Sequence, residues 1–267
     1  MDTGIKISYY KPCEALKPYV RYYYTLKCGS HTNVLTFPLG LPQIIFHFKN
    51  PLYIPELKEF QSKFTISGQV NFPSHVVSDG NTEMFVAVFY PHTLSHFIAT
   101  PLSAFYNCEI SGFDLESADI NTVAAQIFDC EDTRARISRL EHFLLSRISN
   151  NYSRKDMLRG AIQTILSDPS VSVDRLSSLS CIGRKQFERI FHANIGMNPK
   201  EYAVIARFQK SLWLMQQGNR NFADIAYTSG YADQSHFNRD FKRYAGMTPS
   251  SLLKTQPIYS DLYSCPV

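Results

Sequence analysis

The sequence lacks long apolar runs and a recognisable export signal. It contains no stretch of about 18 consecutive apolar residues, so we expect no membrane-spanning helix and no membrane partner. The opening residues, MDTGIKISYYKPCEAL, have no apolar core behind a basic start, which argues against a secretory signal. The sequence therefore predicts a cytoplasmic protein.

Paired cysteines and clustered metal ligands are also missing. The six cysteines are scattered and no CxxC pair occurs, so the pattern is a poor match to a disulfide framework and a worse match to a zinc site. His92 and His96 stand four residues apart, but no third or fourth ligand follows at a recognised spacing. We expect no metal and no cofactor.

The residues that are present indicate a globular chain of two domains. The length of 267 residues and the apolar fraction of 44% suit two separate cores. Residues 1–132 carry 8 basic and 13 acidic side chains, a net charge of −5, whereas residues 133–267 carry 19 and 10, a net charge of +9. This asymmetry favours contact between the second half and a polyanion, although a solvated basic surface is an equal alternative.

Hydrophobic patterns divide the chain further. Residues from about 5 to 110 contain short β-branched and aromatic runs cut by Pro and Gly, which predict a small curled sheet or barrel. Short helices are expected after Pro91 and through DINTVAAQIF. From residue 133 the apolar period is 3.6, with arginines opposite the apolar stripe. The expected parts are a β-rich domain (1–132), a helical connector (133–156), an all-helical domain (157–254) and an irregular tail (255–267).

The connector helix is compatible with three arrangements. Its apolar stripe is formed by Ile137, Leu140, Leu144 and Ile148. Such a helix can join the domains, pair with a second copy of itself, or pack on its own domain.

The segment FADIAYTSGYADQSHFNRDFKRYAGMTP predicts two short helices joined by a tight turn. Gly230 supplies the backbone freedom that ends the first helix. Asp233 and Ser235 are both candidate N-caps of the second helix. The outward face of the second helix is formed by Gln234, Ser235, His236, Asn238, Arg239, Lys242 and Arg243.

The segment SVDRLSSLSCIGRKQFERIFHANIGMNP repeats this organisation about fifty residues earlier. Phe187 and Phe191 have the same spacing as Phe237 and Phe241, and both segments close with a Gly-Met-x-Pro phrase. We interpret the two segments as copies of one helix-turn-helix unit, with the phenylalanines in the core. The outward face of the first copy is formed by Arg184, Lys185, Glu188 and Arg189.

A longer helix is predicted between the two units. Asn198 caps it, Pro199 occupies its first position, and Gly218 ends it. About 20 helical residues span roughly 30 Å. This length is close to the ~34 Å between successive major-groove segments on one side of B-DNA.

The stretch IAYTSGYADQSHFNRDFKRYAGMTPSSL strongly resembles the signature of AraC/XylS-type transcription regulators. That signature reads I-A-x-x-x-G-F/Y-x-x-x-S-x-F-x-R-x-F-K-x-x-x-G-x-x-P. The resemblance covers residues from roughly 160 to 254. Residues 1–110 also resemble an N-terminal domain often paired with this module, through KPYVRYYY, PLGLPQIIFHF and SGQV.

The resemblance implies a bacterial, non-enzymatic regulator that reads double-stranded DNA with both recognition helices. It also implies a homodimer, RNA polymerase as a further partner, and a small-molecule effector in the N-terminal domain. A filled β core without a ligand is the alternative to an effector site. The DNA-binding candidates are Arg184, Lys185, Glu188, Arg189, Gln234, Ser235, His236, Asn238, Arg239 and Lys242, whose side-chain types include those that pair with guanine, adenine and cytosine.

The first unit departs from the family pattern at two positions. Gly183 stands where a Ser or Thr N-cap is usual, and Ser177 stands where Ala is common.

Two enzyme hypotheses compete with the regulator. One is a DNA-repair methyltransferase with a zinc-held acceptor cysteine, and the other is a cupin-like metalloenzyme fused to a DNA reader. Both require a metal cluster that the sequence does not show.

Overall fold

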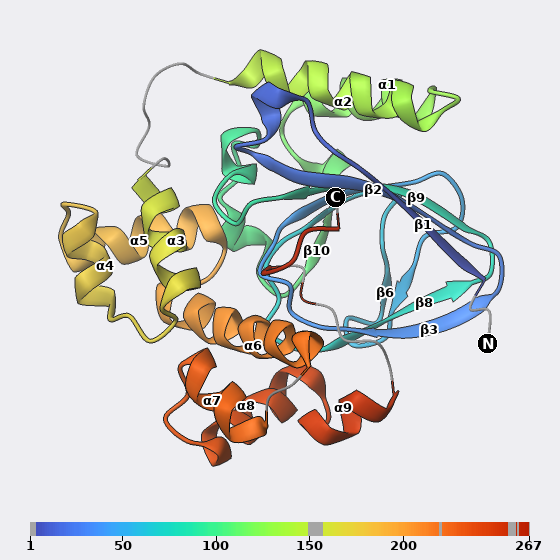
Figure 1. Cartoon of the computed structure of the whole chain (residues 1–267). Coiled ribbons are helices and arrows are strands. Elements are labelled where there is room, and N and C mark those ends of the chain that lie inside the picture. Colours follow the sequence, from blue (N-terminus) through green and yellow to red (C-terminus); the bar gives the residue numbers. More distant parts are fainter. Residues whose placement is uncertain (1–3, 149–156, 219–220, 256–259, 261, 267) are drawn as a thin grey trace.

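The computed structural model describes residues 4–148, 157–218, 221–255, 260 and 262–266. Figure 1 shows a β-rich part and a helical part that packs against it. This is the expected succession of a β-rich domain and an all-helical domain with two helix-turn-helix units. The linker expected at residues 150–156 lies outside the described residues.

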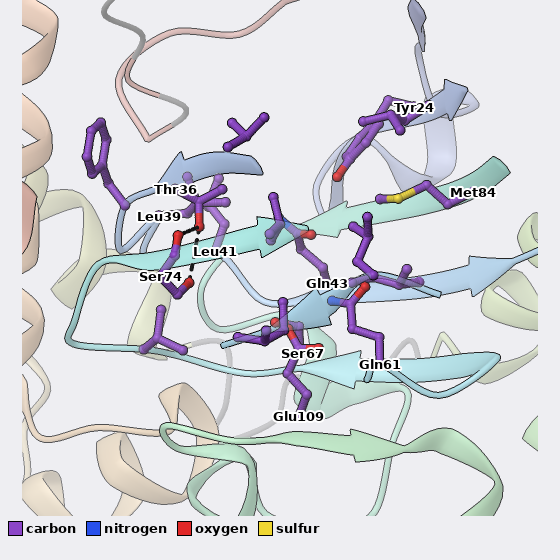
Figure 2. Close-up of a pocket in the computed structure, with 18 of the residues that line it drawn as sticks. Tyr24, Thr36, Leu39, Leu41, Gln43, Gln61, Ser67, Ser74, Met84 and Glu109 are labelled. Carbon is purple, nitrogen blue, oxygen red and sulfur yellow. Dashed lines mark hydrogen bonds between the residues drawn. The ribbon is translucent and has the colours of Figure 1, made fainter. Parts of the chain in front are cut away.

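The β-rich part contains two antiparallel sheets, with strand orders β1-β2-β9-β4-β7-β10 and β3-β8-β5-β6. No ladder joins the two sheets in the part of the chain that the structure describes, so the arrangement is open and not a closed barrel. Residues of both sheets line a pocket (Figure 2). The strands are β1 (Ile5–Tyr10), β2 (Val20–Cys28), β3 (His31–Thr36), β4 (Gln43–His47), β5 (Tyr53–Ile54), β6 (Glu59–Phe60), β7 (Phe64–Ser67), β8 (Ser74–Asp79), β9 (Thr82–Phe89) and β10 (Glu109–Ser111).

Strand β9 is buried on both faces, which explains its almost continuous apolar sequence. Side chains alternate along a strand, so Met84 and Val86 enter one core and Phe85 and Phe89 enter another. The first core continues into the helical part, and the second is covered by helices. These are η1 (Glu14–Leu16), η2 (Leu94–His96), η3 (Leu102–Phe105), η4 (Gly112–Asp114), α1 (Ala118–Phe128) and α2 (Thr133–Arg147).

Helix α2 packs on α1 and on the β-rich part. The side chain of Asp132 caps α2 by accepting a hydrogen bond from the backbone N–H of Ala135. The expectation that the arginines lie opposite the buried stripe is wrong for Arg136, which is only 8% exposed. Its guanidinium lies 3.4 Å from the ring centre of Phe48, and Nη1 donates to Oε1 of Glu83 over 3.2 Å. The aromatic ring and the carboxylate together compensate for the burial of this charge.

The helical part is organised around α6. Phe187, Phe191, Phe237 and Phe241 are all fully buried, as their spacing predicted. The ring of Phe208, on α6, contacts Phe241 edge-on with a centroid distance of 5.3 Å. The helices are α3 (Met157–Ser167), α4 (Val173–Leu179), α5 (Arg184–Ile195), α6 (Pro199–Gln217), α7 (Phe222–Ser229), α8 (Gln234–Ala245) and α9 (Pro249–Thr255).

Thr255, the first residue of the expected irregular tail, instead ends α9. Residues 260 and 262–266 contain no helix or strand and pack closely on both parts. Leu262 is 3% exposed, and the backbone oxygen of Ser264 accepts a hydrogen bond from Nη2 of Arg21 over 2.8 Å. The ring of Tyr263 stacks on Trp213 of α6. The tail therefore joins the β-rich part to α6.

In the described part of the chain, no helix has the length and apolar character needed to cross a bilayer. The same residues contain no cluster of three or more His, Cys, Asp or Glu side chains arranged to hold a metal ion.

Gly230 ends α7 in the left-handed region with φ of +88°. A Cβ atom at this position would meet its nearest neighbour at 3.8 Å, so the cost of a side chain comes from the backbone and not from a clash. We expect Gly230→Ala to lower the free energy of unfolding by about 1–2 kcal/mol in urea denaturation. Gly160→Ala is the matched control, because Gly160 lies in α3 with open space around it, and this change should stabilise by roughly 0.5–1 kcal/mol. Equal effects at the two sites would contradict the assigned turn.

Candidate functional site

The two helix-turn-helix units share a left-handed residue in the turn between their helices, but they differ in the N-cap of the second helix. The first is α4 and α5, and the second is α7 and α8. Cys181, which the repeat aligns with Gly230, has φ of +54° and so adopts the same left-handed turn without being glycine. In the second unit the N-cap of α8 is Asp233, whose side chain accepts from the N–H of His236 over 2.7 Å. This resolves the choice between Asp233 and Ser235. Gly183 is the N-cap of α5 and contributes no side-chain hydrogen bond.

Helix α8 presents most of its predicted DNA-binding residues to solvent. His236 differs, because its ring contacts Tyr231 edge-on at 5.3 Å and its Nε2 lies 3.4 Å from Oδ2 of Asp240. It is therefore half-buried and faces the inside of the unit. The exposed members of the set are Gln234, Ser235, Asn238, Arg239 and Lys242.

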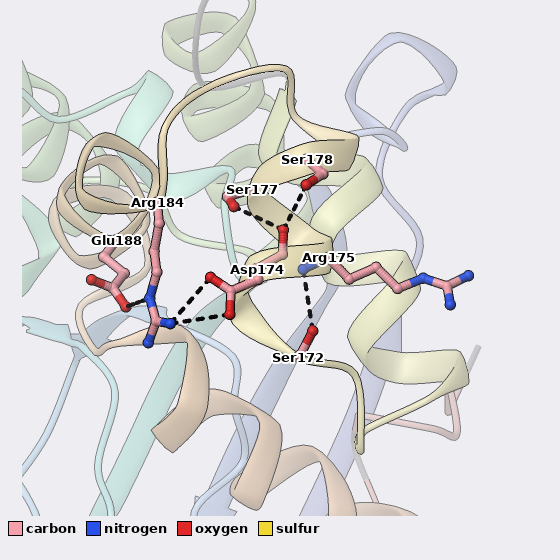
Figure 3. Close-up of polar contacts among 7 residues, drawn as sticks. All are labelled: Ser172, Asp174, Arg175, Ser177, Ser178, Arg184 and Glu188. Atoms are coloured by element: carbon pink, nitrogen blue, oxygen red, sulfur yellow. Dashed lines mark hydrogen bonds and ion pairs between the residues drawn. The ribbon is translucent and has the colours of Figure 1, made fainter.

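The predicted DNA-binding residues of helix α5 differ in whether they already have partners within the chain. Arg184 is exposed but forms two ion pairs (Figure 3). Its Nε lies 3.1 Å from Oε1 of Glu188, and its Nη1 lies 3.1 Å from Oδ1 of Asp174 on α4. Arg184 thus joins the two helices of the first unit. Lys185 and Arg189 are exposed.

Helix α6 holds the two units at a fixed spacing. It has 19 residues, which corresponds to roughly 29 Å at 1.5 Å per residue. Asn198 and Glu201 form a capping box at its start, and Pro199 occupies its first turn, as the sequence predicted. Buried residues occur on more than one face of α6 because helices of both units pack against it.

The pocket of the β-rich part is a cavity of about 290 Å³ with mainly apolar walls. One group of its polar side chains is formed by Gln43, Gln61, Ser67 and Glu109, which Figure 2 shows close together. The hydroxyl groups of Thr36 and Ser74 lie elsewhere in the lining and pair with each other. Oε2 of Glu109 is shielded from solvent and has no hydrogen-bond partner among the described residues. Burial raises the pKa of Glu109 to about 7, against the lowering effect of the neighbouring Gln61 and Ser67 side chains.

Gln61 connects this half-buried carboxyl group to a fully buried histidine. Nε2 of His47 and Oε1 of Gln61 are 2.8 Å apart, so the imidazole donates to the amide oxygen. Burial lowers the pKa of His47 to about 4, while the hydrogen bond to Gln61 raises it. His47 is therefore a neutral strand residue at pH 7.

The loop between β3 and β4 separates the pocket from α6. Leu39, Gly40 and Leu41 line the pocket on one side of this loop. On the other side, Nε2 of Gln209 donates to the backbone oxygen of Pro38 over 2.6 Å, and the ring of Phe37 contacts Phe208 edge-on. The wall of the pocket is thus also a surface against which α6 packs.

A second contact joins the pocket to the end of α5. Gln69 lines the pocket, and its Cγ lies 3.4 Å from the position of a Cβ atom at Gly196. The same Cβ atom would be 3.0 Å from the backbone oxygen of Leu102. Gly196 ends α5 with φ of +101°, so both the turn and the close approach require glycine.

These features define a two-domain helix-turn-helix protein with a pocket beside its linker helix. Residues 176–255 match a family model described as a helix-turn-helix domain, and residues 8–111 match a domain of unknown function. The helical part is a helix-turn-helix domain of the AraC type.

Several known proteins are similar to this chain. An uncharacterised HTH-type transcriptional regulator of Haemophilus influenzae is 32% identical over 100 residues, which are 37% of this chain and 34% of that protein. The uncharacterised regulator YidL of Escherichia coli is 26% identical over 182 residues, 64% of this chain and 60% of that protein. The crystal structure of ToxT from Vibrio cholerae O395 has 13% identity and a TM-score of 0.44, covering 93% of this chain and 96% of that chain. The chain spans about a third of the length of the first curated relatives that it matches.

Sequence reasoning missed the polar side of the pocket and the Arg184 ion pairs. Glu109, Gln61 and Gln69 stand in short, unremarkable segments, and nothing in their spacing indicates that they meet. The pairing of Arg184 with Glu188 is a standard four-residue helix spacing and was predictable. Its pairing with Asp174 depends on how α4 and α5 cross.

The opposite pKa shifts of His47 and Glu109 predict opposite pH effects on stability. His47 contributes stability that is lost as the pH falls from 6.5 toward 4, because the unfolded chain takes up its proton first. Glu109 contributes stability that is present below pH 4.5 and is lost as the pH rises through 7. Each slope approaches about 1.4 kcal/mol per pH unit inside its window.

We therefore expect Glu109→Gln to gain stability relative to the unchanged protein as the pH rises from 4.5 to 7. As the pH rises from 4 to 6.5, His47→Gln should become less stable relative to the unchanged protein, because only the unchanged protein gains stability from its neutral His47. Urea denaturation of the three proteins at several pH values measures both differences. Parallel pH profiles for the three proteins would contradict these assignments.

Proposed function

We propose that this protein is a transcription regulator that binds specific DNA sequences through α5 and α8. The observation that carries the proposal is the pair of helix-turn-helix units held by one helix of roughly 29 Å. This length is similar to one turn of B-DNA, about 34 Å, so the two recognition helices suit successive major-groove segments on one side of a duplex. The regulators named among the similar proteins support the same role.

The residues proposed to read bases are the exposed polar residues of both helices. Arg189 and Arg239 are suited to bidentate contacts with guanine, and Gln234 to contact with adenine. Lys185 and Lys242 are suited to phosphates or bases. Arg184, Glu188 and His236 also belong to the proposed interface. In the free protein their charged groups already pair within the chain, Arg184 with Asp174 and Glu188, and His236 with Asp240. These residues can contact DNA either by leaving those partners or by using donor and acceptor atoms that the pairs do not occupy.

We further propose that a small molecule in the pocket controls DNA binding. The pocket shares the β3–β4 loop with α6 and shares Gln69 with the end of α5. A ligand that orders either wall therefore changes the packing of the element that sets the spacing of the recognition helices. Homodimerisation, contact with RNA polymerase and a cytoplasmic location belong to the same proposal. Sedimentation at several protein concentrations tests the dimer.

Selection of bound duplexes from a random DNA pool, with the full chain at moderate salt, tests the main proposal. We expect the selected sequences to contain two short motifs about one helical turn apart. Binding that weakens with salt but does not depend on the DNA sequence would overturn the proposal that two helices recognise specific bases.

We expect Arg239→Ala to weaken binding to the selected duplex by about 1–3 kcal/mol and to relax the preference at one base position. Fluorescence anisotropy with the selected duplex and single-base variants measures both effects. Arg139→Ala is the matched control, because it removes the same charge from an exposed position on α2. An equal loss in the two variants would show that Arg239 contributes only long-range charge.

A further inference from the structure

The pocket has an unusual distribution of charge. Among the described residues that line it, Glu109 is the only carboxylic acid and there is no Lys, Arg or His. Most of the other lining residues are apolar, and they include Ile7, Leu26, Ile45 and Met84. The remaining polar side chains, such as Thr36 and Ser74, are uncharged. The pocket is therefore an apolar chamber with a single acidic side chain.

The polar side of the pocket has unused hydrogen-bonding capacity. Oε2 of Glu109 has no hydrogen-bond partner in the described part of the chain, and neither does the side-chain amide of Gln69, which is 1% exposed. Buried polar atoms without partners cost free energy, which a ligand group with several donors would recover. A donor-rich group is required at Glu109, because a carboxylate only accepts hydrogen bonds.

The titratable groups around Glu109 favour a cationic group over an anionic one. Glu59 on β6 adds negative charge, and the neighbouring Cys108 has a raised pKa and so stays neutral at pH 7. His47, which reaches this group through Gln61, is also neutral at pH 7. No cation among the described lining residues neutralises Glu109. An ammonium group would do so, whereas a ligand carboxylate would be repelled.

We propose that the pocket binds an apolar molecule with one protonated amine, with the ammonium group at Glu109 and the hydrocarbon against the apolar walls. This inference names the chemical class of the effector and rests on the proposed function of the pocket. An ammonium group has three donors and no acceptor, which suits a carboxylate that has an unused acceptor atom. The volume of about 290 Å³ suits a small ligand and not a lipid with two long chains.

Isothermal titration of the full chain with octylamine, octan-1-ol and octanoate at pH 7 tests this inference without DNA. The three probes have the same chain and differ only in the head group. We expect octylamine to bind at least tenfold more tightly than octan-1-ol, and octanoate to bind more weakly than either. Octanoate binding as tightly as octylamine, or no octylamine binding, would overturn the inference.

Glu109→Gln keeps the shape of the side chain and removes its charge. We expect this variant to lose at least tenfold in affinity for octylamine and to keep its affinity for octan-1-ol, which also shows that the pocket is intact. Glu116→Gln is the matched control, because Glu116 is exposed and does not line the pocket. Unchanged octylamine affinity in Glu109→Gln would overturn the assignment of the carboxylate.

Proton release provides a test that needs no variant. The pKa of Glu109 is raised to about 7, so part of this carboxyl group is protonated near neutral pH and must lose its proton when an ammonium group binds. Titration at several pH values, in buffers with different ionisation enthalpies, should show that octylamine releases a fraction of a proton that falls as the pH rises through the pKa of Glu109, whereas octan-1-ol releases none. Equal proton release by both probes would overturn the inference.

The ligand inference and the proposed function can fail separately. Sequence-specific DNA binding without amine binding would reject only the ligand class. Amine binding without sequence-specific DNA binding would reject the proposed recognition of DNA.

Discussion

The burial of helix α6 on several sides at once is the constraint on which the other features depend. A surface helix usually buries one stripe. In α6, Tyr202, Ile205, Phe208 and Leu212 are all fully buried, because helices of both units and the β3–β4 loop pack around it. A helix held on so many sides cannot rotate without disturbing each neighbour. The spacing of the two recognition helices is therefore a property of the whole molecule.

One buried amide group illustrates how this packing is made specific. Gln209 is fully buried on α6, its Nε2 donates to Pro38, and its Oε1 accepts from Ser260 over 2.8 Å. The two partners come from the β-rich part and from the tail. Because a buried amide without partners is costly, these two hydrogen bonds favour one relative position of three segments that are far apart in the sequence. Phe37 and Leu39, the neighbours of Pro38 in the chain, line the pocket.

Some of the predicted DNA-binding residues on the surface of the helical part also form contacts within the chain. Several predicted DNA-binding residues are exposed, but Arg184 is shared with Asp174 and Glu188, and His236 is turned toward Tyr231. Exposed ion pairs contribute little to stability. Exchanging such a pair for a phosphate or a base edge therefore costs little, so an internal ion pair does not remove Arg184 from a DNA interface.

The sequence by itself determined the local features of this protein. The two-unit repeat, the capping of α6 at Asn198, the buried phenylalanines and the order of the two domains all follow from short-range rules of spacing, capping and turn formation. The sequence left two candidates, Asp233 and Ser235, for the N-cap of α8. It placed Arg136 on the exposed face because its partners come from distant segments, Glu83 from β9 and Phe48 from the residue after β4. Only the tertiary structure brought Glu109, Gln61 and Gln69 together in one pocket and placed that pocket against α6. The physical reason is that these contacts join residues far apart in the chain, and a linear pattern carries no information about which distant segments meet.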